Sequence, residues 1–315
     1  MQIFRSLSEL GNFAPASVVT IGNFDGVHRG HRMVIDAVTA RARDLHARSV
    51  AVTFDPHPLR ILKPEVDVRL ITPLAQKLDL LAATGLDAVL VLPFTPEFSN
   101  WTAREFATRV LHDALHTVEV HEGETFRFGH DAAEDVTGLS HLGEDLGFTV
   151  RAYHPENFRG SPVSSSRVRT LVAAGTMNQV RALLGRSFSI RSTPASGRGY
   201  GTRYTVPTIN LAPYSDLLPA NGVYITTLRV ANERTFRSVT NAGNRPTFGA
   251  DSFAVESYCL DFEPIALTED TPLELTFLKR LRGEIRFPSP EALRAQIGID
   301  VAKAERYFTL CSRNS

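Results

Sequence analysis

The segment "VVTIGNFDGVHRGHRMVIDAV" at residues 18–38 passes from an apolar run, through a glycine-containing loop, into a stretch with apolar residues at helical spacing. A strand-to-helix connection needs a glycine and a residue that caps the helix. It does not need His28 and His31, three residues apart with Gly30 between them. These residues indicate that the loop has a chemical role besides connecting two elements.

Strand-like and helix-like patterns alternate through the first half of the chain. Helical spacing of apolar residues predicts helices over residues 32–47, 73–83 and 102–115. Short apolar segments predict strands over residues 18–21, 49–54, 88–93, 118–120 and 148–153. This alternation predicts a Rossmann-like α/β domain with a parallel sheet covered on both faces.

The pattern changes near Gly185. One last helix is predicted over residues 166–184, and the segment "GRSFSIRSTPASGRGYG" that follows is rich in Ser and Gly. Short alternating segments such as "GVYITTLRV" then predict an antiparallel β-barrel or sandwich, and Ser289 and Pro290 mark the start of a C-terminal helix. We therefore expect two domains, at residues 1–185 and 186–315.

The composition limits the class of protein. The 315 residues hold 34 Lys and Arg against 34 Asp and Glu, so no basic excess favours nucleic acid or anionic lipid as a partner. The two cysteines, Cys259 and Cys311, are too few for a disulfide framework or a zinc site. Apolar runs are far shorter than the ~18 residues of a membrane span, and "MQIFRSLSEL" has no apolar signal core. We expect a cytoplasmic protein.

The position of the first loop favours a phosphate ligand. In an open parallel sheet, ligands bind beyond the carboxyl ends of the strands, and the following helix offers free N–H groups to an anion. Gly22, Gly26 and Gly30 allow close approach of the backbone, and histidines can donate to phosphate oxygens. The alternative is that the histidines are ordinary polar residues at a helix start, since the spacing is not that of a P-loop.

Four motifs occur in order: "GNFDGVHRGH" (22–31), "VTFDPHP" (52–58), "EGETFRFG" (122–129) and "SSSRVR" (164–169). Together they resemble the bacterial bifunctional riboflavin kinase/FMN adenylyltransferases (FAD synthetases), and the resemblance spans nearly the whole chain. It implies a nucleotidyltransferase domain in which the FMN phosphate attacks the α-phosphorus of ATP and pyrophosphate leaves.

The resemblance also implies roles for individual residues. His28 and His31 would be catalytic and hold the ATP phosphates, and further phosphate contacts would come from Gly22, Phe24, Gly30, Ser164, Ser165 and Arg167. The flavin would be bound by Asp55, His57, Thr125, Phe126, Arg127 and Phe128. Two structural alternatives stay open: the residues of "FDPHP" can shape a turn, and Phe126 and Phe128 can belong to the hydrophobic core. Thr125 stands where the family usually has Asp or Asn, and Ser166 stands where Thr is common; both residues carry a hydroxyl.

The second domain resembles the family's riboflavin kinase module. In "VPTIN", Thr208 and Asn210 would hold Mg²⁺ and nucleotide phosphates, and in "VESYCLDF", Glu256 would be the base for the ribityl 5′-hydroxyl. Arg282 would lie near the flavin, and the glycine loop would bring Gly197 and Gly201 to ATP. "NAGNRPTFG" at 241–249 matches a further family segment.

Two departures affect the kinase prediction. Thr205 replaces a glycine, and "EPIALTEDTPLE" lacks the family's Asp-Leu-Tyr-Gly segment. Pro-Thr-x-Asn can also be a turn, and Glu256 can be an exposed strand residue.

The favoured function is a two-step enzyme that makes FMN and then FAD. The alternatives are an adenylyltransferase with a degenerate flavin-binding kinase domain, or a non-catalytic flavin sensor. A transfer-RNA-binding synthetase relative is disfavoured by the balanced charge.

Overall fold

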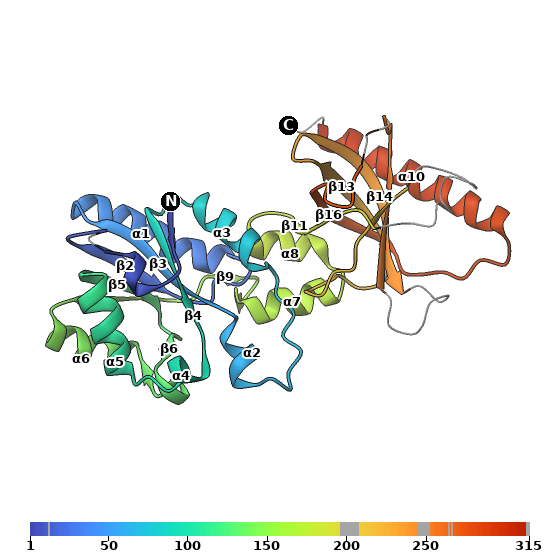
Figure 1. The fold of residues 1–315 in the computed structure, drawn as a ribbon. Coiled ribbons are helices and arrows are strands. Elements are labelled where there is room, and N and C mark those ends of the chain that lie inside the picture. The colour runs from blue at the N-terminus through green and yellow to red at the C-terminus, as the bar shows by residue number, and fades with distance from the viewer. Residues whose placement is uncertain (12, 196–207, 245–252, 264, 266, 313–315) are drawn as a thin grey trace. The chain divides into compact units, whose positions relative to one another are not determined.

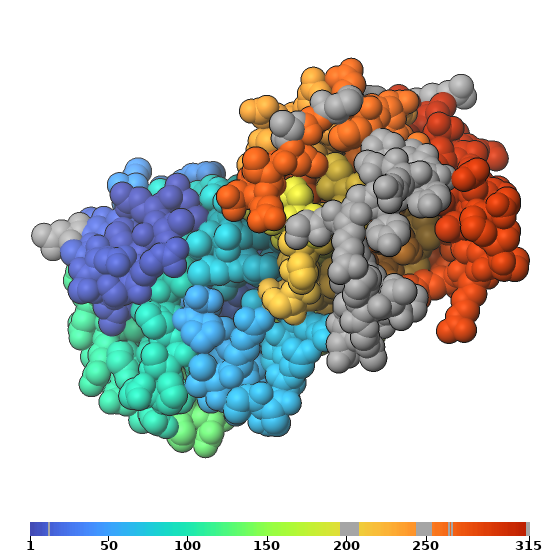
Figure 2. Space-filling view, turned by 45° about the vertical axis from the view of Figure 1, so that its right-hand side comes forward, coloured from blue at the N-terminus to red at the C-terminus, as the bar shows by residue number. Residues whose placement is uncertain are grey.

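The computed structural model describes residues 1–11, 13–195, 208–244, 253–263, 265 and 267–312 (Figure 1). The chain forms two compact units, residues 1–165 and 166–315, which are coloured blue to green and yellow to red in Figure 2. The functional boundary at 185/186 remains a prediction. None of the described helices is both long enough and apolar enough to span a membrane.

A parallel sheet organises the first unit, as predicted. Its strand order is β1-β4-β3-β2-β5-β8, and all neighbours run parallel. Its strands are β1 (Gln2–Phe4), β2 (Ser17–Ile21), β3 (Arg48–Asp55), β4 (Ala88–Pro93), β5 (Thr117–Gly123) and β8 (Thr149–Tyr153). The remaining strands of this unit are β6 (Arg127–Phe128), β7 (Glu134–Asp135), β9 (Asn157–Phe158) and β10 (Ser161–Pro162).

Helices cover both faces of this sheet. On one face, α1 (Arg29–Asp44) and α3 (Leu74–Ala82) pack Ile35, Val38 and Leu81 against Val18. On the other face, Val19 and Val120 contact residues of three elements, α5 (Ala103–Phe106), the π-helical η2 (Ala107–Ala114) and α6 (Val136–Leu146). The unit also contains η1 (Leu7–Glu9), α2 (Pro58–Leu62), α4 (Pro96–Ser99) and η3 (His130–Ala132).

Local signals account for most boundaries, but some elements differ from the prediction. The edge strand β1 and helix α6 were not expected from the sequence. The single helix predicted over residues 166–184 is wrong: it is two helices, α7 (Ser165–Ala173) and α8 (Met177–Leu184). Gly175 between them has φ +71°, a left-handed conformation that ends α7.

The second unit is an antiparallel sheet of six strands in the order β11-β16-β13-β14-β15-β12. It curls into a half-barrel, and a bridge between Pro194 and Leu211 brings its two edge strands together. The strands are β11 (Phe188–Ser192), β12 (Thr208–Leu211), β13 (Gly222–Val230), β14 (Arg234–Asn244), β15 (Phe253–Cys259) and β16 (Leu273–Arg282). This confirms the predicted class of an α/β domain followed by an antiparallel β domain.

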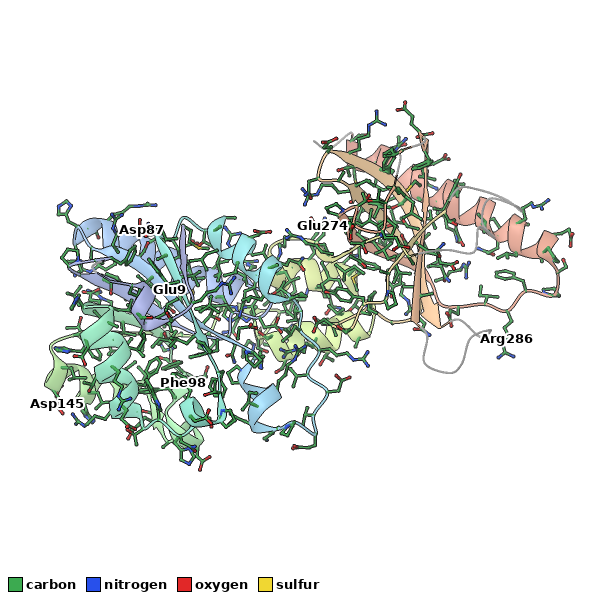
Figure 3. All side chains as sticks on the ribbon, in the orientation of Figure 1. Glu9, Asp87, Phe98, Asp145, Glu274 and Arg286 are labelled. Atoms are coloured by element: carbon green, nitrogen blue, oxygen red, sulfur yellow. The ribbon has the colours of Figure 1, made fainter. Side chains whose placement is uncertain are left out.

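Side-chain contacts join strands of the second unit and cap its C-terminal helix. Glu274 on β16, labelled in Figure 3, accepts a hydrogen bond from Ser189 Oγ at 2.9 Å and pairs with Arg229, so it links β16 to β11 and β13. The C-terminal helix α10 (Pro290–Ser312) begins where predicted, with Ser289 Oγ accepting from the Ala292 N–H at 3.2 Å.

Candidate active sites

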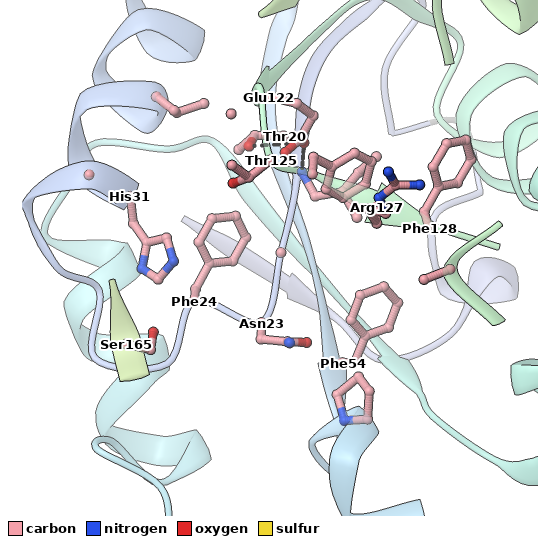
Figure 4. A pocket seen from close by; sticks show the side chains of 18 of the residues that line it. Thr20, Asn23, Phe24, His31, Phe54, Glu122, Thr125, Arg127, Phe128 and Ser165 are labelled. Carbon is pink, nitrogen blue, oxygen red and sulfur yellow. Dashed lines mark hydrogen bonds between the residues drawn. The ribbon is translucent and has the colours of Figure 1, made fainter. Parts of the chain in front are cut away.

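A cavity of about 640 Å³ opens at the carboxyl ends of β2 and β5 (Figure 4). These strands are neighbours in the sheet, although β3 and β4 follow β2 in the chain and lie on its other side. The strand order therefore reverses between β2 and β5, which is where open parallel sheets bind their ligands.

The loop from Gly22 to His28 is held by buried polar contacts. The Asp25 carboxylate accepts hydrogen bonds from the N–H groups of Ile71 and Thr72 at 3.1 and 3.0 Å. The loop contains two non-glycine residues in left-handed conformations, Phe24 at φ +46° and Val27 at φ +38°. Such conformations persist only where surrounding contacts hold them, and the Asp25 contacts are of that kind.

The two predicted histidines lie together at the start of α1. His28 is the N-cap, and its Nδ1 accepts from the His31 N–H at 3.3 Å. Their rings stack with centroids 3.6 Å apart, and the Phe24 ring meets His31 edge-on at 5.3 Å. Gly30 lines the same cavity. A Cβ at Gly22 would approach the Phe24 ring to 3.2 Å, so Gly22 leaves room for that ring.

The electrostatics of His31 are unusual. Burial, the neighbouring His28 and the positive charge of Lys77 hold the pKa of His31 well below its usual value, so the free imidazole is neutral. Its Nδ1 is buried and has no hydrogen-bond partner in the described part of the chain. An anionic phosphate beside it would supply both a partner and a counter-charge.

Lys77 lies beneath this loop and was missed in the sequence. Its ammonium donates to Asn23 O at 3.1 Å, Thr53 Oγ1 at 3.0 Å and Phe54 O at 3.4 Å. These contacts join the loop after β2 to the end of β3. A lysine on an amphipathic helix is usually exposed to solvent, so the sequence around Lys77 did not indicate a buried position.

The serine motif reaches the cavity in part. Ser164 and Ser165 both line it, and Ser165 Oγ donates to Asp25 O at 2.8 Å. Arg167 lies on α7 in the second unit and is half-buried, and its contact with phosphate remains a prediction.

The other half of the cavity is aromatic. Phe126 and Phe128 stack at 5.4 Å, and they line the cavity together with Thr125 and Arg127, as the motif suggested. Phe128 meets Phe106 at 6.1 Å, and a chain of ring contacts continues from there. The sequence did not single out the other members of this wall, Phe54, Phe94, Phe98, Trp101 and Phe106. They come from separate elements: Phe54 from the end of β3, Phe98 and Phe106 from α4 and α5, and Phe94 and Trp101 from loops.

Asp55 and His57 are not among the residues that line this cavity. His57 caps α2, and its Nδ1 accepts from the Leu59 N–H at 3.2 Å. Asp55 is exposed and precedes a cis peptide bond to Pro56. Their contact with flavin stays a prediction, and the geometry supports the turn interpretation of "FDPHP" for His57.

Two further polar groups face the cavity. Glu122, at the end of β5, is buried, and its Oε1 accepts from the Ile21 N–H and from Thr20 Oγ1. Tyr153 is hydrogen-bonded at 2.9 Å to His121, whose Nε2 lies 3.1 Å from Glu119. Hydrogen bonds from Arg41 hold the pKa of Glu119 at about 2, and because burial lowers the pKa of His121, the imidazole is neutral. A neutral His121 that donates from Nε2 to Glu119 leaves its Nδ1 to accept the Tyr153 hydroxyl proton.

In the second unit, strand register places the predicted kinase residues on one face. Asn210 on β12 is paired with Glu256 on β15, and Glu256 is paired with Asn241 on β14. Thr208 lies two residues before Asn210 and shares its face. Asn241 belongs to the "NAGNRPTFG" motif but had no predicted role. Gly197, Gly201 and Thr205 lie outside the described residues.

Arg282 has a structural partner. Its Nε donates to Asp300 Oδ2 at 2.8 Å, and Gln296 donates to the other carboxylate oxygen at 3.0 Å. Asp300 is buried on α10, so this pair connects the end of β16 to the C-terminal helix. Contact of Arg282 with flavin remains a prediction.

The donor set of the second unit fits a hydrated Mg²⁺. Thr208 and Asn210 offer uncharged oxygens beside the Glu256 carboxylate. No group of three or more His, Cys, Asp or Glu suited to a metal occurs among the described residues. Magnesium usually keeps several water ligands and binds phosphate oxygens of the substrate, so it requires only a few ligands from the protein.

Comparison with known proteins finds a matching family for each half of the chain. A family model for FAD synthetase matches residues 12–167, and one for riboflavin kinase matches residues 184–308. The bifunctional riboflavin kinase/FMN adenylyltransferase of Pseudomonas fluorescens is 35% identical, over 96% of this chain and 97% of its own. The enzyme of that name from Escherichia coli (strain K12) is 31% identical, over 98% of this chain and 99% of its own length.

Fold similarity extends over both units. A crystal structure of a macrolide-efflux protein from Streptococcus pneumoniae matches with a TM-score of 0.86 at 24% identity, covering 96% of this chain and 98% of that one. At this identity the match supports the fold alone. The near-complete coverage of the two named relatives carries the assignment: the chain belongs to the family of bifunctional riboflavin kinase/FMN adenylyltransferases.

Proposed function

We propose that the two units catalyse successive steps of FAD biosynthesis. The second unit phosphorylates riboflavin to FMN with ATP, and the first unit adenylylates FMN to FAD. One observation carries the second step: a single cavity joins the stacked histidines at the start of α1 to an aromatic wall against which a flavin ring can pack.

Adenylyl transfer in this cavity needs positioning and charge neutralisation. A phosphate oxygen of FMN attacks the α-phosphorus of ATP, a new P–O bond forms, and the bond to the leaving pyrophosphate breaks. His28 and His31 lie where the helix N-terminus favours anions, and they donate to the phosphates. Ser164 and Ser165 contribute hydroxyls at the same wall.

Phosphorylation of riboflavin uses the row of residues across β12, β15 and β14. Glu256 accepts the proton of the ribityl 5′-hydroxyl as that oxygen attacks the γ-phosphorus of ATP, and ADP leaves. Mg²⁺ supplies charge neutralisation at the nucleotide phosphates when bound. Thr208 and Asn210 would hold it, because their oxygens share a face with Glu256.

Product analysis tests this assignment. The purified chain is incubated with ATP and Mg²⁺, once with riboflavin and once with FMN, and the flavins are separated by chromatography. FAD from both substrates is expected. FAD from FMN alone would favour the alternative with an inactive kinase unit, for which the missing Asp-Leu-Tyr-Gly segment is the motivation. Flavin binding without pyrophosphate release would favour the flavin sensor.

A further inference from the structure

Glu122 occupies an unusual place in the first unit. It is a glutamate only 4% exposed, at the carboxyl end of β5 in the crevice where the strand order reverses. A buried carboxyl group is costly unless its oxygens are paired. Its presence at the wall of the ligand cavity therefore requires a physical reason.

One of its oxygens has a structural partner. Pairing between β2 and β5 ends at Val19 and Val120. The Gly22 N–H points toward β3 and donates to Val52 O at 2.9 Å. Because N–H directions alternate along a strand, the Ile21 N–H points toward β5. Beyond this point, Glu122 Oε1 accepts hydrogen bonds from the Ile21 N–H and from Thr20 Oγ1 (dashed lines in Figure 4). This oxygen thus replaces the strand partner that β5 no longer provides.

The other oxygen, Oε2, makes no hydrogen bond within the described residues, and Glu122 lines the cavity. Burial raises the pKa of Glu122 well above its usual value and so favours the protonated, uncharged acid. With Oε1 accepting two hydrogen bonds, the acid proton belongs on Oε2. The side chain then presents one O–H donor to the ligand.

The direction of Glu122 identifies which ligand it meets. Side chains two residues apart on a strand share a face, so Glu122 lies on the same face as Val120, whose core cluster contains Phe106 and Phe128. Figure 4 shows His31 and Ser165 on one side of Phe24, and Arg127, Phe128 and Phe54 on the other. The aromatic side is the part of the cavity assigned above to the flavin.

We propose that Glu122 selects the flavin substrate by donating a hydrogen bond from Oε2 to a ring acceptor of FMN, a nitrogen or carbonyl oxygen of the isoalloxazine. This inference rests on the proposed function of the first unit. Glu122 is a specificity residue, and the phosphate chemistry stays with the histidines.

Other titratable groups share the cavity wall. They are His28 and His31 from α1, Arg127 and Asp131 after β5, and Tyr153, His154 and Glu156 at and after β8. Within the described residues, none of them pairs with Glu122, whose partners are Thr20 and Ile21. Its protonation state is therefore set mainly by burial.

Steady-state kinetics of FAD formation by the full chain test the proposal, with Glu122→Gln, Glu122→Leu and the exposed control Glu144→Gln. Glutamine keeps the acceptor for Ile21 and places an N–H donor where Oε2 lies, so its KM for FMN should stay within about twofold of wild type. Leucine removes the donor and should raise the KM for FMN about tenfold. The KM for ATP should not change in either variant.

The pH profile separates recognition from a purely structural role. In the wild type, the KM for FMN should rise as the pH passes upward through the raised pKa of Glu122, because a carboxylate cannot donate. In Glu122→Gln this rise should be absent. The same rise in both chains, an unchanged KM for FMN in Glu122→Leu, or a raised KM for ATP would each overturn the inference.

Failure of the proposed function would look different. If the wild-type chain formed no FAD from FMN, adenylyl transfer would be refuted, and the inference would be judged on flavin binding alone. Quenching of flavin fluorescence should then be weaker for Glu122→Leu and unchanged for Glu122→Gln. Equal quenching by all chains would overturn it.

Discussion

The imidazole rings of His28 and His31 lie stacked, with centroids 3.6 Å apart and planes inclined by 15°. The shared helix start explains this: His28 caps α1 and His31 occupies its first turn. Stacking of this kind disfavours charge on both rings, and His28 is one of the causes that lower the pKa of His31, so an anionic phosphate beside the pair would favour protonation of the His31 ring.

Replacing His31 with alanine should separate the two activities. We expect His31→Ala to reduce FAD formation from FMN by about a hundredfold, since a donor to the transferring phosphates is lost. Phosphorylation of riboflavin should stay near wild type. Chromatography of the flavin products measures both, with the exposed His46→Ala as control. Equal loss of both activities would contradict independent sites.

Glu256→Gln should have the opposite effect. The amide cannot accept the ribityl proton, so conversion of riboflavin to FMN should fall by about a hundredfold or more, while FAD formation from supplied FMN continues. The exposed Glu233→Gln is a suitable control. An unaffected kinase rate would remove Glu256 from the role of base.

Acid should weaken the first unit through His31. The pKa of His31 is low in the folded chain because of burial, His28 and Lys77, whereas in the unfolded chain it returns to near 6.5. Below that pH the unfolded state binds more protons than the folded state, so the free energy of unfolding falls as the pH falls. His31→Gln should flatten this acid dependence in urea titrations between about pH 7 and 5. Identical slopes for both chains would disprove the assignment.

Lys77→Met should destabilise the loop that carries the histidines. Three acceptors, including the carbonyls of Asn23 and Phe54, would lose their buried donor. We expect the free energy of unfolding to drop by about 2 kcal/mol and FAD formation to fall with it. The exposed Lys63→Met serves as the matched control. Retention of wild-type stability would mean that water replaces the ammonium.

Asp300→Ala should cost about 3 kcal/mol of unfolding free energy, because it leaves the largely buried Arg282 without its charge partner. Arg282→Gln should cost a similar amount, and the double variant should cost much less than the sum. Denaturant unfolding measures all three, with Arg286→Gln as an exposed control. Additive losses would show that the two residues act separately.

Local patterns in the sequence were sufficient for much of the fold. The apolar run at β2, the N-cap at His28 and the Ser-Pro start of α10 depend on neighbours within a few residues, so periodicity and capping predict them. The family resemblance placed the histidine, serine and "FRFG" motifs, and the structure brings all three to one cavity.

The sequence by itself determined the alternation of elements, the helix start that presents the histidines, and the motifs that identify the chemistry. Only the tertiary structure decided which distant residues complete the site. Glu122 meets Ile21 across 101 positions of sequence because β2 and β5 are neighbours where the strand order reverses. Asn241 reaches Glu256 through antiparallel register. Strand order and register follow from the packing of the whole chain, which local periodicity does not encode.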